Sequence, residues 1–201
     1  MLRLDHLAVS ATDLAEGVAA VEAILGLPLA AGGKHPHMAT HNRLLGLGDV
    51  YLEVIAADPD APAPAWPRWF DLDQFVGPAR LTNWICATDD LDGAVQAAPK
   101  GVGVPVDLQR GDFRWRMAVP DDGRLPFDNA FPALIEWRGP HPAARLPDVG
   151  ARLHRLEVAH PMADALRACI ELADPRVVFV PGDHKALRAE IDTPHGRRVL
   201  E

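Results

Sequence analysis

Short apolar segments alternate with amphipathic stretches along the chain, and this arrangement occurs three times. Residues 3–9, 80–86 and 152–158 align without a gap, and each segment precedes a stretch in which apolar residues have helical spacing. A repeat of one supersecondary unit determines the architecture of a chain. The pattern therefore predicts three related modules.

The first module shows the predicted order of elements. Polar and apolar residues alternate over 4–9, as in a half-buried strand, and helical spacing follows over 14–25. Gly26 can take the left-handed conformation that ends a helix. Two further strands are expected at 41–47 and 50–56, after a weaker one. The order is β-α-β-β-β, which predicts the α+β class.

The repeat divides the chain into modules and linkers, and the third module is expected to be βαβββ-like. The first linker is rich in proline and aromatic residues, which favours a strap packed across a sheet. A lid over a ligand pocket is the alternative. We expect modules at 1–58, 80–138 and 151–201, joined by linkers at 59–79 and 139–150.

Polar residues recur at equivalent points of the first two modules. His6 in the first strand aligns with Asn83 in the second module, and a glutamate follows in each case. Glu53 comes 47 residues after His6 (6 to 53). Glu136 comes 53 residues after Asn83 (83 to 136). If the two modules adjoin, these four side chains could hold a metal ion or a polar ligand.

The third module has lost part of this pattern. Arg155 stands at the histidine position, although Glu201 remains. His154 is one residue out of register and should face the helix side. We expect this module to be structural, or to form a contact in a homodimer.

Composition argues against several classes of function. The 201 residues carry a net charge of −8 without a basic stripe, so nucleic acid is not expected as a partner. No apolar run is long enough for a membrane span, and a first strand from about Leu2 leaves no room for a signal peptide. Cys86 and Cys169 fit no metal or redox spacing and are interpreted as buried thiols of a cytoplasmic protein. Three lysines against seventeen arginines suggest a GC-rich bacterial genome.

The tandem modules, with a histidine in the first strand and a glutamate in the fourth, resemble the vicinal oxygen chelate superfamily. That superfamily includes glyoxalase I, extradiol dioxygenases and fosfomycin-resistance enzymes. The segments that look like its glyoxalase-like-domain branch are LDHLAV (4–9), the run 40–53, FRWR (113–116) and LIEW (134–137). The resemblance implies that the first two modules form one curved mixed sheet with the helices outside.

The same resemblance implies a metal site. In that superfamily, ligands from the first and fourth strands of both modules converge on one divalent ion. His6, Glu53 and Glu136 match three of these ligands. Asn83 stands where a histidine is usual, and its amide would be a weak, neutral ligand. The set could suit iron(II), manganese(II), nickel(II) or zinc(II), and no organic cofactor is expected.

A hydrogen-bonded polar cluster is the alternative to a metal site. Two inward carboxylates without a cation would repel each other, and one of them would take up a proton. A histidine between two strand glutamates would then have only a structural role.

Three histidines form a second group of candidates. His37 and His41 could line the mouth of the cup, where they would orient a substrate carbonyl or transfer a proton, with His41 as the catalytic candidate. Their spacing with His35 also permits a separate metal site.

The remaining substrate-binding candidates lie on predicted strands. Arg114 and Arg116 share one strand face and could bind a substrate carboxylate in fork geometry; a solvated face is the alternative. Asn42, at the start of a strand, is a further candidate.

Two functions follow from the resemblance. The first is a metal-assisted lyase, isomerase or dioxygenase acting on a small oxygenated molecule, with Glu53 or Glu136 as the base. The second is a metal-free protein that sequesters a small ligand. The set of His6, Glu53 and Glu136 favours the enzyme, whereas Asn83 favours sequestration.

Overall fold

Two β-sheets organise the chain in the computed structural model, which describes all of residues 1–201. The first half contains β1 (Arg3–Ser10), α1 (Leu14–Leu25), β2 (Ala30–His35), β3 (Thr40–Gly46), β4 (Tyr51–Ala57), the 3-10 turn η1 (Trp69–Gln74), β5 (Arg80–Ala87) and α2 (Leu91–Ala97). The second half contains β6 (Val104–Arg110), β7 (Phe113–Val119), α3 (Pro126–Asn129), β8 (Ala133–Trp137), the 3-10 turn η2 (Pro142–Arg145), β9 (Arg152–His160), α4 (Ala163–Ala168), β10 (Val177–Pro181), β11 (Ala186–Thr193) and β12 (Gly196–Leu200).

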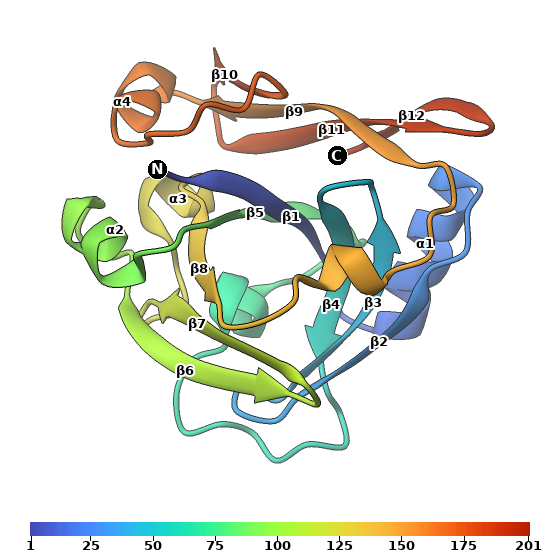
Figure 1. The fold of residues 1–201 in the computed structure, drawn as a ribbon, viewed down its shortest axis with the longest axis horizontal. Helices are drawn as coiled ribbons and strands as arrows, with labels where there is room; N and C mark the ends of the chain where they lie inside the picture. Colours follow the sequence, from blue (N-terminus) through green and yellow to red (C-terminus); the bar gives the residue numbers. More distant parts are fainter.

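The larger sheet joins two β-α-β-β-β modules through their first strands. Its eight strands have the order β2-β3-β4-β1-β5-β8-β7-β6. β1 pairs with β4 and β5 pairs with β8 in parallel, whereas β1 and β5 are antiparallel. The sheet is strongly curled, with α1 and α2 on its outer side (Figure 1). The predicted α+β class, with tandem modules in one curved sheet, is confirmed.

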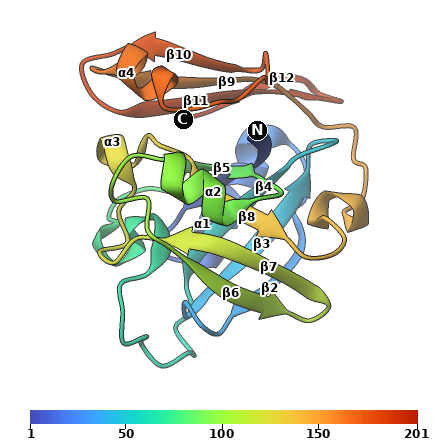
Figure 2. The ribbon, with the colours of Figure 1, turned by 60° about the vertical axis from the view of Figure 1, so that its left-hand side comes forward.

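The C-terminal part forms a separate four-stranded sheet with the order β10-β9-β11-β12. It lies over the middle of the larger sheet, above β1 and β5 (Figures 1 and 2). Its elements follow the βαβββ order, but β9 pairs with β10 and β11 rather than with the last strand. The third module therefore repeats the order of the elements and not their pairing, and Glu201 has no structural equivalence to Glu53.

Local sequence explains how α1 begins and ends. The side chain of Asp13 accepts a hydrogen bond from the backbone N–H of Glu16, which satisfies one of the free donors of the first turn. Gly26 then adopts a left-handed φ of 69° and closes the last turn. The predicted helix 14–25 matches α1.

The core lies on both sides of the larger sheet. On its outer side, Trp84 of β5 is fully buried and meets Phe179 of the second sheet edge to face, with ring centroids 6.0 Å apart. On its inner side, Trp69 and Phe70 of the first linker are buried. None of the helices is long and apolar enough to cross a membrane. The prediction of two buried cysteines is half wrong: Cys86 is buried, but Cys169 is exposed just after the short helix α4.

Candidate functional site

A β-bulge in the first strand shapes the site. The pairing of β1 with β5 shifts register between Leu4 and His6, so Asp5 is an extra residue. A bulge breaks the alternation of side chains, and the side chains of Asp5 and His6 come into contact as a result. Asp5 Oδ1 and His6 Nδ1 are 2.5 Å apart, and both side chains are buried.

The concave face of the larger sheet, which we call the cup, holds a cavity of about 30 Å³. This space is comparable to that of a single water molecule. Its polar lining comes mainly from the first module, and the apolar wall comes from the second module and the strap η1. The lining residues are His6, His35, Asn42, Tyr51, Glu53, Trp69, Phe70, Arg110, Trp115, Met117, Ile135 and Trp137.

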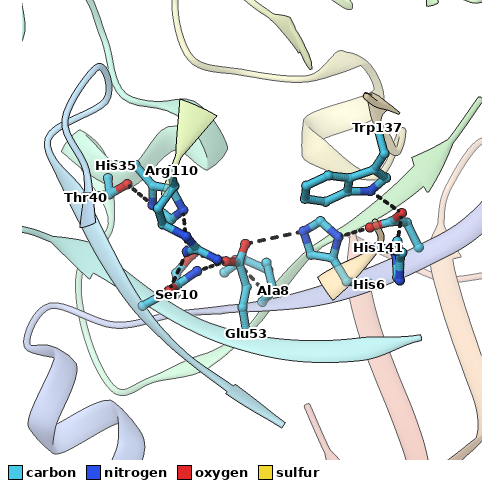
Figure 3. A network of polar contacts seen from close by, with 12 residues as sticks. His6, Ala8, Ser10, His35, Thr40, Glu53, Arg110, Trp137 and His141 are labelled. Carbon is cyan, nitrogen blue, oxygen red and sulfur yellow. Dashed lines mark hydrogen bonds and ion pairs between the residues drawn. The ribbon is translucent and has the colours of Figure 1, made fainter. Parts of the chain in front are cut away.

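Polar contacts run without interruption across the floor of the cup (Figure 3). His6 is held between two carboxylates: Asp5 on its Nδ1, and Glu53 on its Nε2, with 3.5 Å between Nε2 and Oε1. The other oxygen of Glu53 accepts a hydrogen bond of 2.8 Å from the amide of Asn42. Asp5 in turn accepts hydrogen bonds from Trp137 Nε1 (2.8 Å) and His141 Nε2 (2.9 Å).

Arg110 extends this network to the far wall. Its guanidinium donates to Asn42 Oδ1 and to His35 Nε2, each at 3.0 Å, and it makes no ion pair. His35 Nε2 is therefore an acceptor, and its Nδ1–H is the donor to Thr40 Oγ1 at 3.1 Å. Because β6 and β2 are the two edges of the sheet, Arg110 links edges that are far apart in the strand order.

The charges of the cup follow from these contacts. Burial alone would lower the pKa of His6, but the hydrogen bonds to Asp5 and Glu53 outweigh it and raise that pKa to about 9. Burial opposes ionisation of Glu53, yet its hydrogen bond to His6 and the imidazolium charge hold the pKa of Glu53 below its usual range. Burial lowers the pKa of His35 to about 4. At neutral pH the cup contains a His6 imidazolium between two carboxylates and a neutral His35.

One donor in the cup has no protein partner. Trp69 Nε1, on the strap, is buried and makes no hydrogen bond. An unpaired buried N–H is costly, and a ligand oxygen in the cup could satisfy it.

Glu136 lies outside the cup, so the prediction that it joins His6 and Glu53 is wrong. Ile135 and Trp137 face the cup, and alternation along β8 directs the residue between them to the outer side. There, Glu136 Oε2 accepts a hydrogen bond of 3.0 Å from the backbone N–H of Leu91, at the start of α2.

The two predicted arginines also face outward. Arg116 pairs with Glu136 in the β7–β8 register, and its guanidinium binds the carboxylate of Asp92 in α2 through two contacts of 2.8 Å. Arg114 follows the same alternation and is exposed. A role for either in binding a ligand of the cup is not supported, because Trp115 and Met117 occupy the inner face of this strand.

The strand pairing identifies the true counterparts of the first-module residues. In the first module, the residue two positions after His6 is Ala8, which pairs with Glu53. In the second module, the residue two positions after Asn83 is Ile85, which pairs with Ala133. Ala133 therefore stands where the first module has Glu53. Asn83 pairs with Ala8 and shares its face of the sheet, but its side chain lies outside the polar network of the cup.

Of the other candidates, the structure places only Asn42 in the cup. His41, its neighbour in β3, points to the opposite face and does not line the cavity. His37 lies on the turn after β2, where its ring stacks on Trp66 at 4.4 Å between centroids. The contacts that sequence reasoning missed are those of Asp5, Arg110 and the linker residue His141.

These residues do not fit a four-ligand metal site. His6 Nε2 and Glu53 supply two donors from the first module, and Asp5 orients the imidazole as it would in a metal site. The counterpart positions offer the amide of Asn83 and the methyl group of Ala133. No three His, Cys, Asp or Glu side chains are grouped so that they could hold a metal ion.

Comparison with known proteins agrees with the fold. Residues 4–172 match the glyoxalase-like domain family, and because the match spans most of the chain, the protein belongs to that family. The resemblance to the vicinal oxygen chelate superfamily is thereby confirmed. No curated protein matches the chain.

Among solved structures, similarity of the overall fold rests on one protein. A hypothetical protein from Staphylococcus aureus has 12% identity and a TM-score of 0.61, and the match covers 92% of this chain and 88% of that one. Methylmalonyl-CoA epimerase from Mycobacterium tuberculosis has 16% identity and a TM-score of 0.45, over 70% of this chain and 91% of that one.

Proposed function

We propose that the protein is an enzyme that moves protons on a small carbonyl compound, as an isomerase or lyase, and that its chemistry takes place in the cup. The observation that carries this proposal is the buried row of Asp5, His6 and Glu53, which places a proton donor beside a carboxylate. General acid–base catalysis needs such a pair within reach of one substrate.

Each residue of the row has a separate role. Glu53, ionised at neutral pH, takes a proton from the carbon next to the substrate carbonyl. His6 Nε2 gives its proton to the carbonyl oxygen, which yields a neutral enol. Glu53 then gives its proton to the former carbonyl carbon, and His6 Nε2 takes back a proton from the hydroxyl group on the neighbouring carbon, which completes the isomerisation of an α-hydroxy carbonyl compound without net change in oxidation state. Asp5 holds the imidazole through Nδ1 and stabilises its charged form.

Two further groups would bind the substrate oxygens. Arg110 is a cation without an ion-pair partner, and Trp69 Nε1 is a donor without an acceptor. Both border the cavity, so both could donate to the carbonyl oxygen while negative charge develops on it in the transition state. The cavity has room for about one water molecule, so the cup must widen to admit a substrate.

Metal-free sequestration is the second candidate function. The walls formed by Phe70, Trp115 and Trp137 suit a flat apolar ligand, which such a protein would hold without turnover. A metal-assisted reaction, as implied by the resemblance, receives less support, because the cup supplies two donors instead of four.

Hydrogen–deuterium exchange separates the candidates. The protein is incubated in D₂O with a panel of small α-hydroxy carbonyl compounds, and loss of the C–H signal next to the carbonyl is followed by proton NMR. We expect exchange with the native protein, and a rate lower by about 10²–10⁴-fold in Glu53→Gln. Glu136→Gln, a matched change on the outer face, is the control and should retain the rate.

Two results would count against the proposed metal-free acid–base enzyme. Saturable binding of panel compounds without exchange would favour sequestration. Loss of exchange on treatment with a chelator, restored by a divalent ion, would favour the metal-assisted reaction.

A further inference from the structure

A second cavity lies at the end of the cup, between β5, the strap η1 and the four-stranded sheet. Its volume is about 460 Å³, far larger than that of the cavity beside His6. Phe70 lines both cavities. The loop before β11 closes one side, so the C-terminal sheet contributes directly to this space.

Two cations without acidic partners border the second cavity. Lys185 Nζ donates to the backbone oxygen of Thr82 at 2.5 Å and takes part in no ion pair. The guanidinium of Arg80 donates to the backbone oxygen of Val76 at 2.9 Å and lies over the ring of Phe75, also without an ion pair. An ammonium group has three donors, so Lys185 retains capacity for an anion.

The acidic side chains at this cavity are engaged elsewhere. Asp71 forms an ion pair with Arg124 at 2.9 Å, and the Glu201 carboxylate lies 3.4 Å from Arg188. Burial, and then the nearby Arg80 charge, lower the pKa of Lys185 to about 8, which is the consequence of a cation held without a counterion.

Asn83 supplies an independent observation. Its side chain is fully buried, and neither the amide nitrogen nor the amide oxygen has a hydrogen-bonding partner. A buried amide without partners is costly. The residue borders the second cavity and lies on the inner face of β5. A ligand there could accept from the nitrogen and donate to the oxygen.

We propose that this cavity binds a small organic anion that carries a hydroxyl group beside its carboxylate. The carboxylate lies against Lys185 and Arg80, and the hydroxyl group meets the amide of Asn83. The apolar remainder of the ligand packs against Phe70 and Phe75. This site is distinct from the acid–base row of the cup, and it uses none of the residues assigned to that row.

Calorimetric titration of the full chain with three probes tests this site. Lactate is a 2-hydroxy carboxylate, propionate lacks the hydroxyl group, and inorganic phosphate reports affinity for any anion. We expect lactate to bind at least about fivefold more tightly than propionate, since one hydrogen bond is gained. Phosphate should bind more weakly than lactate.

Variants assign the binding to this cavity. Lys185→Met should weaken lactate binding by about tenfold or more, because a charge-assisted contact is lost. Asn83→Ala should remove the preference for lactate over propionate. Lys100→Met, at an exposed lysine remote from the cavity lining, is the control and should bind lactate like the native protein. Arg110→Met, in the cup, should also leave it unchanged.

Several outcomes would overturn the proposal. Absence of saturable lactate binding by the native protein is one, and equal affinity in Lys185→Met and Lys100→Met is another. Loss of binding in Arg110→Met alone would place the anion in the cup instead. If Asn83→Ala does not fold, the comparison of lactate with propionate in the native protein and in Lys185→Met still decides the question.

Discussion

The two modules of the larger sheet have the same order and pairing of strands, but their inner faces carry different side chains. On the inner face of the first module lie His6, Asn42 and Glu53, all buried and hydrogen-bonded. On the inner face of the second module, the corresponding strands present Ala133 and Ile135. Strand order and pairing repeat, whereas the titratable residues do not.

This difference shows that fold and site are determined separately. The fold requires strands whose apolar side chains can be buried on both faces of the sheet, and the strands of both modules meet that requirement. A site requires particular side chains on one face; the first module supplies the histidine and the glutamate, and the second module adds Arg110 and the indole of Trp137 to the polar network. Fold alone therefore does not establish function, even between two halves of one sheet.

The largest expected effect contrasts the two glutamates. Glu53→Gln leaves the buried His6 imidazolium with one carboxylate instead of two, and we expect a loss of about 3 kcal/mol in the free energy of unfolding. Glu136→Gln, on the outer face, should cost about 1 kcal/mol or less. Urea denaturation at pH 7 measures both. Equal losses would mean that the first module has no special electrostatic role.

The two buried histidines should respond to pH in opposite directions. The pKa of His6 is raised to about 9, so its contribution to stability is present below about pH 6.5 and is lost as the pH rises through about 9. For His35, with a pKa of about 4, the unfolded chain binds the proton more readily, so stability falls as the pH drops from about 6.5 to 4. Lowered pKa values of Asp5 and Glu53 add a loss in the same acid direction.

Urea denaturation across pH 4–10 tests these signs. We expect His6→Gln to lack the alkaline loss, which is worth roughly 3 kcal/mol, and His35→Gln to show a shallower acid loss. The difference between each variant and the native protein isolates one histidine. An alkaline loss that persists unchanged in His6→Gln would show that His6 is not the charged centre of the row.

Supplying the second module with the missing ligands should create a metal site. In the double variant Asn83→His, Ala133→Glu, both new side chains occupy the inner face at the counterparts of His6 and Glu53. We expect it to bind zinc(II) more tightly than the native protein by about tenfold or more, measured by competition with a chromogenic chelator. Asn83→His alone should gain less. No gain in the double variant would mean that the four positions do not converge.

The smallest effect is expected for the outward-facing arginines. Arg114→Ala and Arg116→Ala should leave the affinity for any ligand of the cup within about twofold of the native value, because neither side chain reaches the inner face. A larger loss would show that β7 presents its other face to the ligand.

The fold was largely predictable because it depends on repetition. Strand alternation, helical spacing and Gly26 mark α1 and the strands around it, and the threefold repeat predicts tandem modules. The division into modules at the predicted boundaries stays a prediction. The proximity of His6 and Glu53 could also be predicted from the repeat, whereas their roles stay a prediction.

The rest of the site depends on features that alternation does not report. Residue counts between strands do not fix which face a residue takes, so Glu136 was assigned to the wrong side. The bulge at Asp5 changes the alternation within β1. Arg110 reaches the cup from an edge strand, and His141 from a linker, so their contacts depend on tertiary structure alone.

The contact of Arg110 with His35 has a consequence for association between molecules. Edge strands expose backbone groups that can pair with another chain. Here the two edges of the eight-stranded sheet approach each other so closely that a Cβ atom on Gly33 would lie 2.7 Å from Cδ of Arg110. A side chain at this position would have to displace the Arg110 side chain, which holds the two edges together through His35 and Asn42, so Gly33 helps to keep both edges covered and unavailable for pairing with another copy.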